Sequence, residues 1–337
     1  YQPEVSQGTL QVHYEFQSLV CQLTGMEVSN SGMYDGATSL AEAALMAARV
    51  TGKQRVTVLE SVSPYHLEVL KTFGDAPGLE IEVVPDGVSQ MPEGSACLIV
   101  QQPTFYGRIV DLSALSALAH SAGALLIVAC DLMSLAMFKP PGDYDADIVV
   151  AEGQTMGVAP TFGGPYVGIF ACKQKYSRQM PGRIIGKTVD ADGREGFVLT
   201  LQTREQHIRR ERATSNICTS VGLIALIATV YMASLGKRGL RHVAESCYHK
   251  AHYAASKIAD IPGYFSESEA TFFREFVVEC PIPPKVINKK LLEYRIIGGL
   301  DVSEYVPNGM LLCCTEVNSK EEIDLLVSAL AEIGGVK

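Results

Sequence analysis

The sequence lacks several patterns that would assign a function directly. No Gly-x-Gly-x-x-Gly follows its first predicted strand, and it contains no Gly-x-Ser-x-Gly and no Cys-x-x-Cys. These absences leave little support for a nicotinamide domain, a nucleophile-elbow hydrolase or a zinc site. The nine cysteines stand singly, apart from the adjacent Cys313 and Cys314, which is typical of a reduced, cytosolic protein.

Positive charge is also scarce, and the formal net charge is -9. This balance argues against a nucleic-acid partner or an anionic membrane surface, since both need a basic field. The one basic cluster, Arg204–Arg212, contains Glu205 and Glu211. We therefore expect a salt-bridged helix or a subunit contact there, in preference to a site for a phosphate polymer.

One uncharged run, Ile217–Gly236, is long enough to cross a bilayer. It carries polar residues such as Thr219 and Ser234, so we expect a buried helix of a large soluble domain instead. The first residue is Tyr1 and not methionine, which suggests a natural N-terminus further upstream.

Short apolar segments alternate with helical patterns through the first two thirds of the chain. The predicted strands are "RVTVLE", "LEIEVVP", "SACLIVQQP", "ALLIVACD", "ADIVVAEG" and "YVGIFACK". Strands that are apolar at nearly every position are buried on both faces, which requires a sheet covered by helices. The pattern predicts an α/β fold, a three-layer sandwich with a mostly parallel sheet, over residues 1–236. Residues 237–337, after a break at Gly236–Gly239, predict a small C-terminal α+β domain.

Ligands of such sheets bind at the carboxyl ends of the strands. Asp131 follows "LLIVAC" and could hold the ring nitrogen of pyridoxal phosphate (PLP) protonated, or it could cap the next turn. The loop "SGMYDGATS" precedes a helix and could cup a phosphate, with Thr38 or Ser39 as the helix cap. Asp35 in that loop would repel the phosphate and use the same donors.

A second loop, Glu152–Tyr166, has the Gly-rich form of a cofactor site but contains no lysine, cysteine, histidine or serine. Elsewhere, His249 and His252 share one helical face, where a solvated surface is a better interpretation than a metal site. We predict no metal-binding residues.

Six sequence motifs indicate a resemblance to a known protein family. The chain resembles the N-terminal-type subunit of glycine dehydrogenase (decarboxylating), the P-protein family of the glycine cleavage system. The resemblance covers essentially the whole chain and rests on "YQPEVSQGTLQ", "LTGMEVSNSGMYDGATSLAEA", "QQPTFYGRIVDL", "DADIVVAEGQTMGVAPTFGGPYVGIFACK", "RRERATSNICT" at Arg209–Thr219, and "IGGLDVSEYVPNGMLLCCTE".

The resemblance implies a fold-type-I PLP architecture and an α2β2 assembly with a homologous, lysine-bearing subunit 2. Alignment on the Gly-rich loop puts the lysine position at Gln154 or Thr155, neither of which forms a Schiff base. PLP is therefore expected on the partner subunit, and the cleft at Tyr34, Asp35, Asp131 and Gln154 is expected to be vestigial.

The implied reaction takes glycine, releases its carboxyl group as CO2 and passes the aminomethyl group to the lipoyl arm of the H-protein, in the cytoplasm. This chain's contributions to the partner's site are expected from Tyr1, Gln2, Glu4 and Gln7. For Gln154, a buried amide that satisfies loop backbone is the better interpretation.

Two alternatives remain. The chain could be a self-sufficient PLP enzyme that uses Lys173 or Lys187, or a stand-alone scaffold or regulatory protein that kept the fold and lost the reaction.

Overall fold

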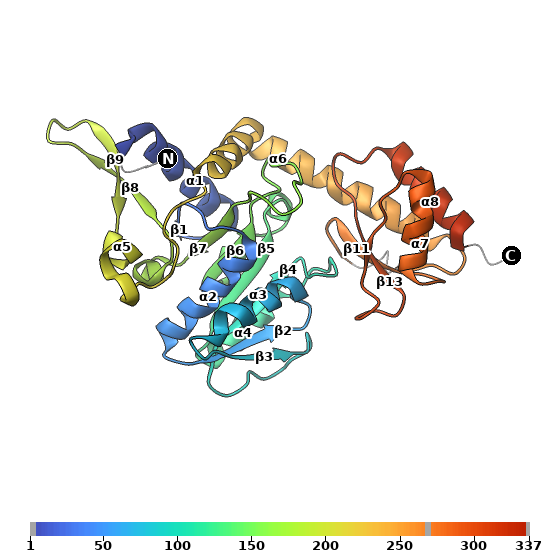
Figure 1. Ribbon diagram of the computed structural model, residues 1–337, viewed down its shortest axis with the longest axis horizontal. Coiled ribbons are helices and arrows are strands. Elements are labelled where there is room, and N and C mark those ends of the chain that lie inside the picture. The colour runs from blue at the N-terminus through green and yellow to red at the C-terminus, as the bar shows by residue number, and fades with distance from the viewer. Residues whose placement is uncertain (1–4, 267–270, 335–337) are drawn as a thin grey trace. The chain divides into compact units, whose positions relative to one another are not determined.

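The computed structural model describes residues 5–266 and 271–334, which fall into two compact units (Figure 1). The first unit runs up to Gln101 and then over Asp111–Lys237, and the second comprises Gln102–Val110 and the chain from Arg238 onward. The chain therefore enters the second unit twice. The short segment Gln102–Val110 is hydrogen-bonded to the later part of the second unit, where the Ile109 amide donates to the Thr271 carbonyl at 3.1 Å.

A seven-stranded sheet in the order β1-β7-β6-β5-β4-β2-β3 forms the centre of the first unit. Strand β2 is parallel to β3 and β4, and β5 is parallel to β6, whereas β7 runs antiparallel to both β6 and β1. This mostly parallel sheet confirms the predicted α/β class. The strands are β1 (Val28–Ser29), β2 (Arg55–Leu59), β3 (Glu80–Val84), β4 (Ser95–Gln102), β5 (Leu125–Asp131), β6 (Ile148–Glu152) and β7 (Gly168–Cys172).

Helices and one hairpin complete this unit. Helix α2 is rich in alanine, and this small side chain lets it pack closely against β5, β6 and β7. The α-helices are α1 (Gln7–Thr24), α2 (Gly36–Thr51), α3 (Pro64–Asp75), α4 (Leu112–Ser121), α5 (Gln206–Arg209) and the first part of α6 (Gly222–Ala259); the hairpin is β8 (Ile184–Val189) with β9 (Glu195–Thr200). Short 3-10 turns are η2 (Ser134–Ala136), η3 (Pro141–Tyr144), η4 (Gln174–Gln179), η5 (Gln202–Arg204) and η6 (Arg210–Arg212).

Helix α6 differs from the expected buried helix over Ile217–Gly236. It begins at Gly222, bends at Gly236 (φ 58°, ψ -175°) and continues to Ala259. By length and apolar composition it would suffice for a membrane span, and 28% of its most apolar 18-residue stretch is buried in the described chain. The expectation of burial was wrong because one face, including Leu223 (69% exposed) and Val230 (54% exposed), is not covered by the described chain.

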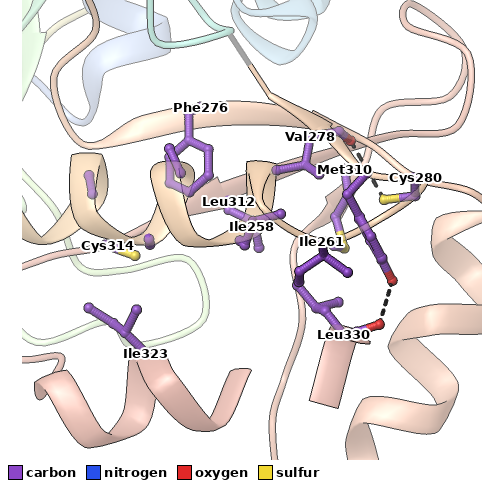
Figure 2. Close-up of a cluster of buried hydrophobic side chains, with 14 of the residues drawn as sticks. Ile258, Ile261, Phe276, Val278, Cys280, Met310, Leu312, Cys314, Ile323 and Leu330 are labelled. Atoms are coloured by element: carbon purple, nitrogen blue, oxygen red, sulfur yellow. Dashed lines mark hydrogen bonds between the residues drawn. The ribbon is translucent and has the colours of Figure 1, made fainter. Parts of the chain in front are cut away.

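The second unit is an antiparallel sheet packed against helices. Its strand order is β10-β11-β13-β12, and the end of α6 together with α7 and α8 supplies apolar side chains to its core. Figure 2 shows this core, where Ile258 of α6, Phe276 of β11 and Leu312 of β13 lie together. The elements are β10 (Phe265–Ser266), β11 (Glu275–Glu279), α7 (Pro284–Leu291), η7 (Leu292–Tyr294), β12 (Leu300–Asp301), β13 (Gly309–Cys313) and α8 (Lys320–Gly334).

A charged network secures the amino end of β6. Asp147 is buried, and its carboxylate accepts hydrogen bonds from Lys173 Nζ at 2.7 Å and from the Leu126 amide at 3.0 Å. His120 Nε2 lies 2.7 Å from Oδ2, the carboxylate oxygen that also accepts from the Leu126 amide, whereas Lys173 contacts Oδ1. Burial raises the pKa of Asp147, but these hydrogen bonds outweigh it and hold the pKa below its ordinary value. The charged form is therefore favoured in the fold.

We expect Asp147→Asn to lower the free energy of unfolding by about 3 kcal/mol at pH 7, because Lys173 would lose its buried counter-charge. Since the pKa of Asp147 is lower in the folded state, its contribution is complete above the ordinary value near 3.8 and is lost as the pH falls below it. Urea unfolding of the wild type and the variant at pH 7, 5 and 3 measures the effect.

The matched control is Asp145→Asn, since the exposed Asp145 carboxylate contacts the same Lys173 Nζ at 2.7 Å. We expect this control to cost about 1 kcal/mol or less. Equal losses in both variants would contradict the assigned role of Asp147.

Candidate functional site

The candidate site lies where β6 ends and α2 begins. A Cβ atom added to Gly36 would stand 2.9 Å from the Glu152 amide nitrogen, and one added to Gly168 would stand 2.2 Å from the Asp35 carbonyl oxygen. These glycines therefore allow the first turn of α2 to lie against the ends of β6 and β7. The polar loops of the sequence analysis are thus brought together at the carboxyl edge of the sheet.

Asp35 is the N-cap of α2, in place of the expected Thr38 or Ser39. Its carboxylate accepts from the Thr38 amide at 2.7 Å and from the Thr38 hydroxyl at 2.8 Å. The Asp35 amide in turn donates to the Thr38 hydroxyl at 3.3 Å, so the two residues form a capping box. The sequence expectation that Asp35 uses the donors of this turn is consistent with this geometry.

Glu152 was named in the sequence analysis only as the start of the Gly-rich loop and was given no role there. The last residue of β6, it accepts hydrogen bonds from the Gly36 amide at 2.9 Å and from the Gln154 amide at 2.9 Å. Burial raises its pKa to about 7; the hydrogen bonds from Gly36 and Gln154 act in the opposite sense, and the nearby Asp35 charge adds to the rise. The only signal in the sequence was an acidic residue at the end of an apolar strand.

These contacts do not fit the phosphate of PLP at the start of α2. A phosphate bound at a helix N-terminus needs free backbone N–H groups and no competing negative charge. Here the Gly36 and Thr38 amides already donate to Glu152 and Asp35, so two carboxyl groups occupy the position.

The two candidate lysine positions carry no amine. The Gln154 side-chain amide donates to the carbonyl of Val158 within the same loop, which supports the interpretation that it satisfies loop backbone. The hydroxyl of Thr155 is buried and has no hydrogen-bond partner among the described residues. Neither group is basic enough to act as the missing lysine.

Lys173 and Lys187 lie elsewhere. Strand β7 runs antiparallel to β6, so its last residue, Cys172, pairs with Ile148 at the amino end of β6. Lys173 follows Cys172 and therefore lies at that end of the strand. Its ammonium group contacts Asp145 and Asp147, both at 2.7 Å, and these contacts outweigh burial and raise its pKa. Lys187 lies on the β8–β9 hairpin and contacts Glu195 at 2.5 Å.

Two of the remaining predicted site residues, Asp131 and Gln7, form hydrogen bonds with backbone groups of the first unit. The Asp131 carboxylate accepts from the Met133 amide at 2.8 Å, as a turn cap does, and Tyr34 is 42% exposed. Gln7 exchanges two hydrogen bonds with the backbone of Phe197 at 2.8 and 2.9 Å, which fixes α1 to the hairpin. Tyr1, Gln2 and Glu4 lie outside the described residues.

Two side predictions can also be compared with the structure. The Nε2–H of His252 donates to the Phe272 carbonyl at 3.0 Å, and its ring stacks on the Phe272 ring with 3.8 Å between centroids, so His252 packs against the protein and is not part of a solvated face. The cluster Arg204–Arg212 forms only a short helix and a 3-10 turn. Glu205 contacts His207 at 3.5 Å within the cluster and Arg183 at 3.6 Å outside it, so no single salt-bridged helix forms, and the alternative of a subunit contact stays a prediction.

A family model described as "Glycine cleavage system P-protein" matches residues 1–330. The chain belongs to this family. A probable glycine dehydrogenase (decarboxylating) subunit 1 of Thermomicrobium roseum is 52% identical over 98% of this chain and 77% of its own length. The protein of the same name from Chlorobium luteolum is 49% identical over 99% of this chain and 77% of its own length.

Solved structures share the fold of this chain. A crystal structure of glycine decarboxylase (P-protein) in inhibitor-bound form is 41% identical, with a TM-score of 0.94 over 99% of this chain and 78% of that chain. A sphingosine-1-phosphate lyase from Burkholderia pseudomallei has a TM-score of 0.72 over 98% of this chain and 78% of that chain at 17% identity, which shows the fold alone. The expected fold-type-I PLP architecture is confirmed.

We expect Glu152→Gln to flatten the dependence of stability on pH. The folded state retains the Glu152 proton up to about pH 7, whereas its ordinary pKa is 4.5, so the wild-type free energy of unfolding falls as the pH rises through this window. The decline amounts to on the order of 2 kcal/mol and is removed in the variant. Urea unfolding at pH 5, 6, 7 and 8 measures it.

Glu93→Gln serves as the control, because Glu93 is exposed in a loop. Its pH profile is expected to run parallel to that of the wild type. The role of Glu152 is refuted if Glu152→Gln also runs parallel.

Proposed function

We propose that this P-protein chain is the subunit of glycine dehydrogenase (decarboxylating) that carries no PLP of its own. The cofactor and its lysine would belong to a homologous subunit 2 in an α2β2 assembly. With that partner, the complex would decarboxylate glycine and pass the aminomethyl group to the lipoyl arm of the H-protein. The family match and the relatives named subunit 1 support a role as one subunit of a larger enzyme.

The observation that carries the proposal is the occupation of the α2 N-terminus by Glu152 and Asp35. A phosphate there would have to displace two carboxyl groups from the donors it needs. The amide at Gln154 removes the second requirement, since an amide neither forms a Schiff base nor takes up a proton near neutral pH. Phosphate binding and covalent attachment are thus lost through different residues.

The alternative of a self-sufficient PLP enzyme has less support. Lys173 lies at the opposite edge of the sheet from Glu152, and its two carboxylate partners stabilise the ammonium form, which is not nucleophilic. Lys187 projects from a hairpin and is paired with Glu195. Neither lysine belongs to the candidate site.

An exposed apolar surface favours an obligate subunit over a stand-alone scaffold. Leu223, Leu226 and Val230 follow one another at helical spacing on one face of α6 and are 69%, 37% and 54% exposed. A groove of about 670 Å³ continues this surface to Val12 of α1 and Pro165 of the Gly-rich loop. Apolar surface of this kind marks a contact with another protein. We assign it to subunit 2 and name it the α6 apolar surface.

A subunit with this function would be located in the cytoplasm. Glycine and the H-protein would be its further partners. The net charge of -9 speaks against nucleic acid as a partner.

We expect the purified chain to contain no pyridoxyl-lysine after incubation with PLP and borohydride reduction, because no lysine stands at the candidate site. Peptide mapping by mass spectrometry measures the labelling. The chain alone is also expected to show no glycine–bicarbonate exchange, and exchange should appear when subunit 2 is added.

The lysine-bearing subunit 2, treated in the same way, is the positive control. A stoichiometric pyridoxyl group on Lys173 or Lys187 would establish the self-sufficient alternative. Exchange by subunit 2 that is unchanged by this chain would favour the scaffold.

We expect Leu223→Glu and Val230→Glu each to weaken association with subunit 2 at least tenfold, because a charge would be buried at the contact. Co-purification and sedimentation velocity measure the association. The stability of the isolated chain should change little, since both side chains are exposed in it.

Leu292→Glu is the matched control, because Leu292 is 61% exposed and lies outside the α6 apolar surface. Undiminished pairing in the Leu223 and Val230 variants would exclude this surface as the contact.

A further inference from the structure

A small polar cavity lies beside the short turns that follow β7 and β9. Its volume is about 220 Å³, and its lining includes Arg178 of η4, Arg204 of η5 and Arg209 of α5, together with Thr203 and Thr214. All of these residues belong to the first unit, and none of them takes part in the site formed by Glu152 and Asp35. Three arginines thus line one cavity in a chain whose net charge is negative.

Arg204 is the informative member, because it is only 6% exposed. Its Nε donates to the Leu201 carbonyl at 3.1 Å, and its two terminal nitrogens donate to the carbonyls of Met180 and Gly182. A guanidinium has five N–H groups, so two remain beyond these three bonds. Burial lowers the pKa of Arg204, although the nearby Glu205 charge opposes this effect.

Neutral carbonyls fix the orientation of Arg204 but supply no full counter-charge. A buried cation is ordinarily paired with an anion, since its desolvation is costly. The neighbouring Glu205 carboxylate lies 3.6 Å from Arg183 and 3.5 Å from His207, and its Oε1 has no hydrogen-bond partner among the described residues. The Nε of Arg209 donates to the Thr203 carbonyl at 3.0 Å. Within residues 5–266 and 271–334, neither Arg178 nor Arg209 forms an ion pair.

We propose that this cavity binds a phosphate group, either inorganic phosphate or the phosphate of a monoester. Guanidinium groups match the oxygens of phosphate in a bidentate manner, and hydroxyls such as those of Thr203 and Thr214 complete such sites. Three arginines against the single carboxylate of Glu205 leave an excess of positive charge, which favours a dianion over a carboxylate. The site is separate from the P-protein cofactor position, and the proposal does not depend on the proposed function.

Isothermal titration calorimetry of the purified chain with inorganic phosphate, at constant ionic strength set by chloride, tests the proposal. We expect saturable binding and a rise in Tm, because the ligand binds only the folded state. Arg178→Gln and Arg209→Gln should each weaken phosphate binding about tenfold, the loss of one charge-assisted contact. Both side chains are exposed, so the variants should keep the wild-type Tm without phosphate.

Arg194→Gln is the matched control, since Arg194 is exposed on the β8–β9 turn and contacts Asp192 at 3.3 Å. It should bind phosphate like the wild type. Methyl phosphate that binds as well as inorganic phosphate would identify a phosphorylated ligand, and binding of inorganic phosphate alone would identify the free ion; both results support the site. No saturable phosphate binding, equal binding in all variants, or an equal effect of acetate would overturn it.

Discussion

The backbone donors at the start of α2 are the constraint on which the functional interpretation depends. In a helix the first amides have no partner within the helix, and a cofactor phosphate is one way to satisfy them. In this chain Asp35 and Glu152 satisfy the Thr38 and Gly36 amides instead. The requirement is intrinsic to the helix, so the position is filled whether or not a cofactor is present. What changes between a cofactor site and this one is the identity of the acceptor.

The direction of β7 is the second constraint. It carries the chain from the candidate site back to the amino edge of the sheet, where Lys173 joins the network around Asp147. A lysine at that position contributes to folding and lies roughly 16 Å along β6 from Glu152, as five residues of an extended strand require. The P-protein fold therefore separates the lysine that this chain has from the place where PLP chemistry would need one.

Much of the fold could be predicted from sequence, because its strands are buried on both faces. Apolar runs such as Leu125–Cys130 have few alternatives, and their order with the intervening helices specifies an α/β sandwich. The burial of α6 could not be predicted, since an apolar helix has the same composition whether its face meets this chain or another.

The candidate site was only partly predictable, for the same reason. Asp35 is adjacent in sequence to the donors that it caps, so its role could be inferred from the loop alone. Glu152 contacts Gly36 across 116 positions of the chain, and only the packing of α2 on β6 brings them together. Arg204 likewise looked like one member of a basic run, although its neighbours in space are the carbonyls of Met180 and Gly182.

The charged network around Asp147 secures β6 at one end of the strand, while Glu152 and the loop of Gln154 lie at the other end. Well-separated positions contribute to stability almost independently. Residues at the α2 end of the strand can therefore differ between members of the fold without weakening the contacts that hold the strand in place.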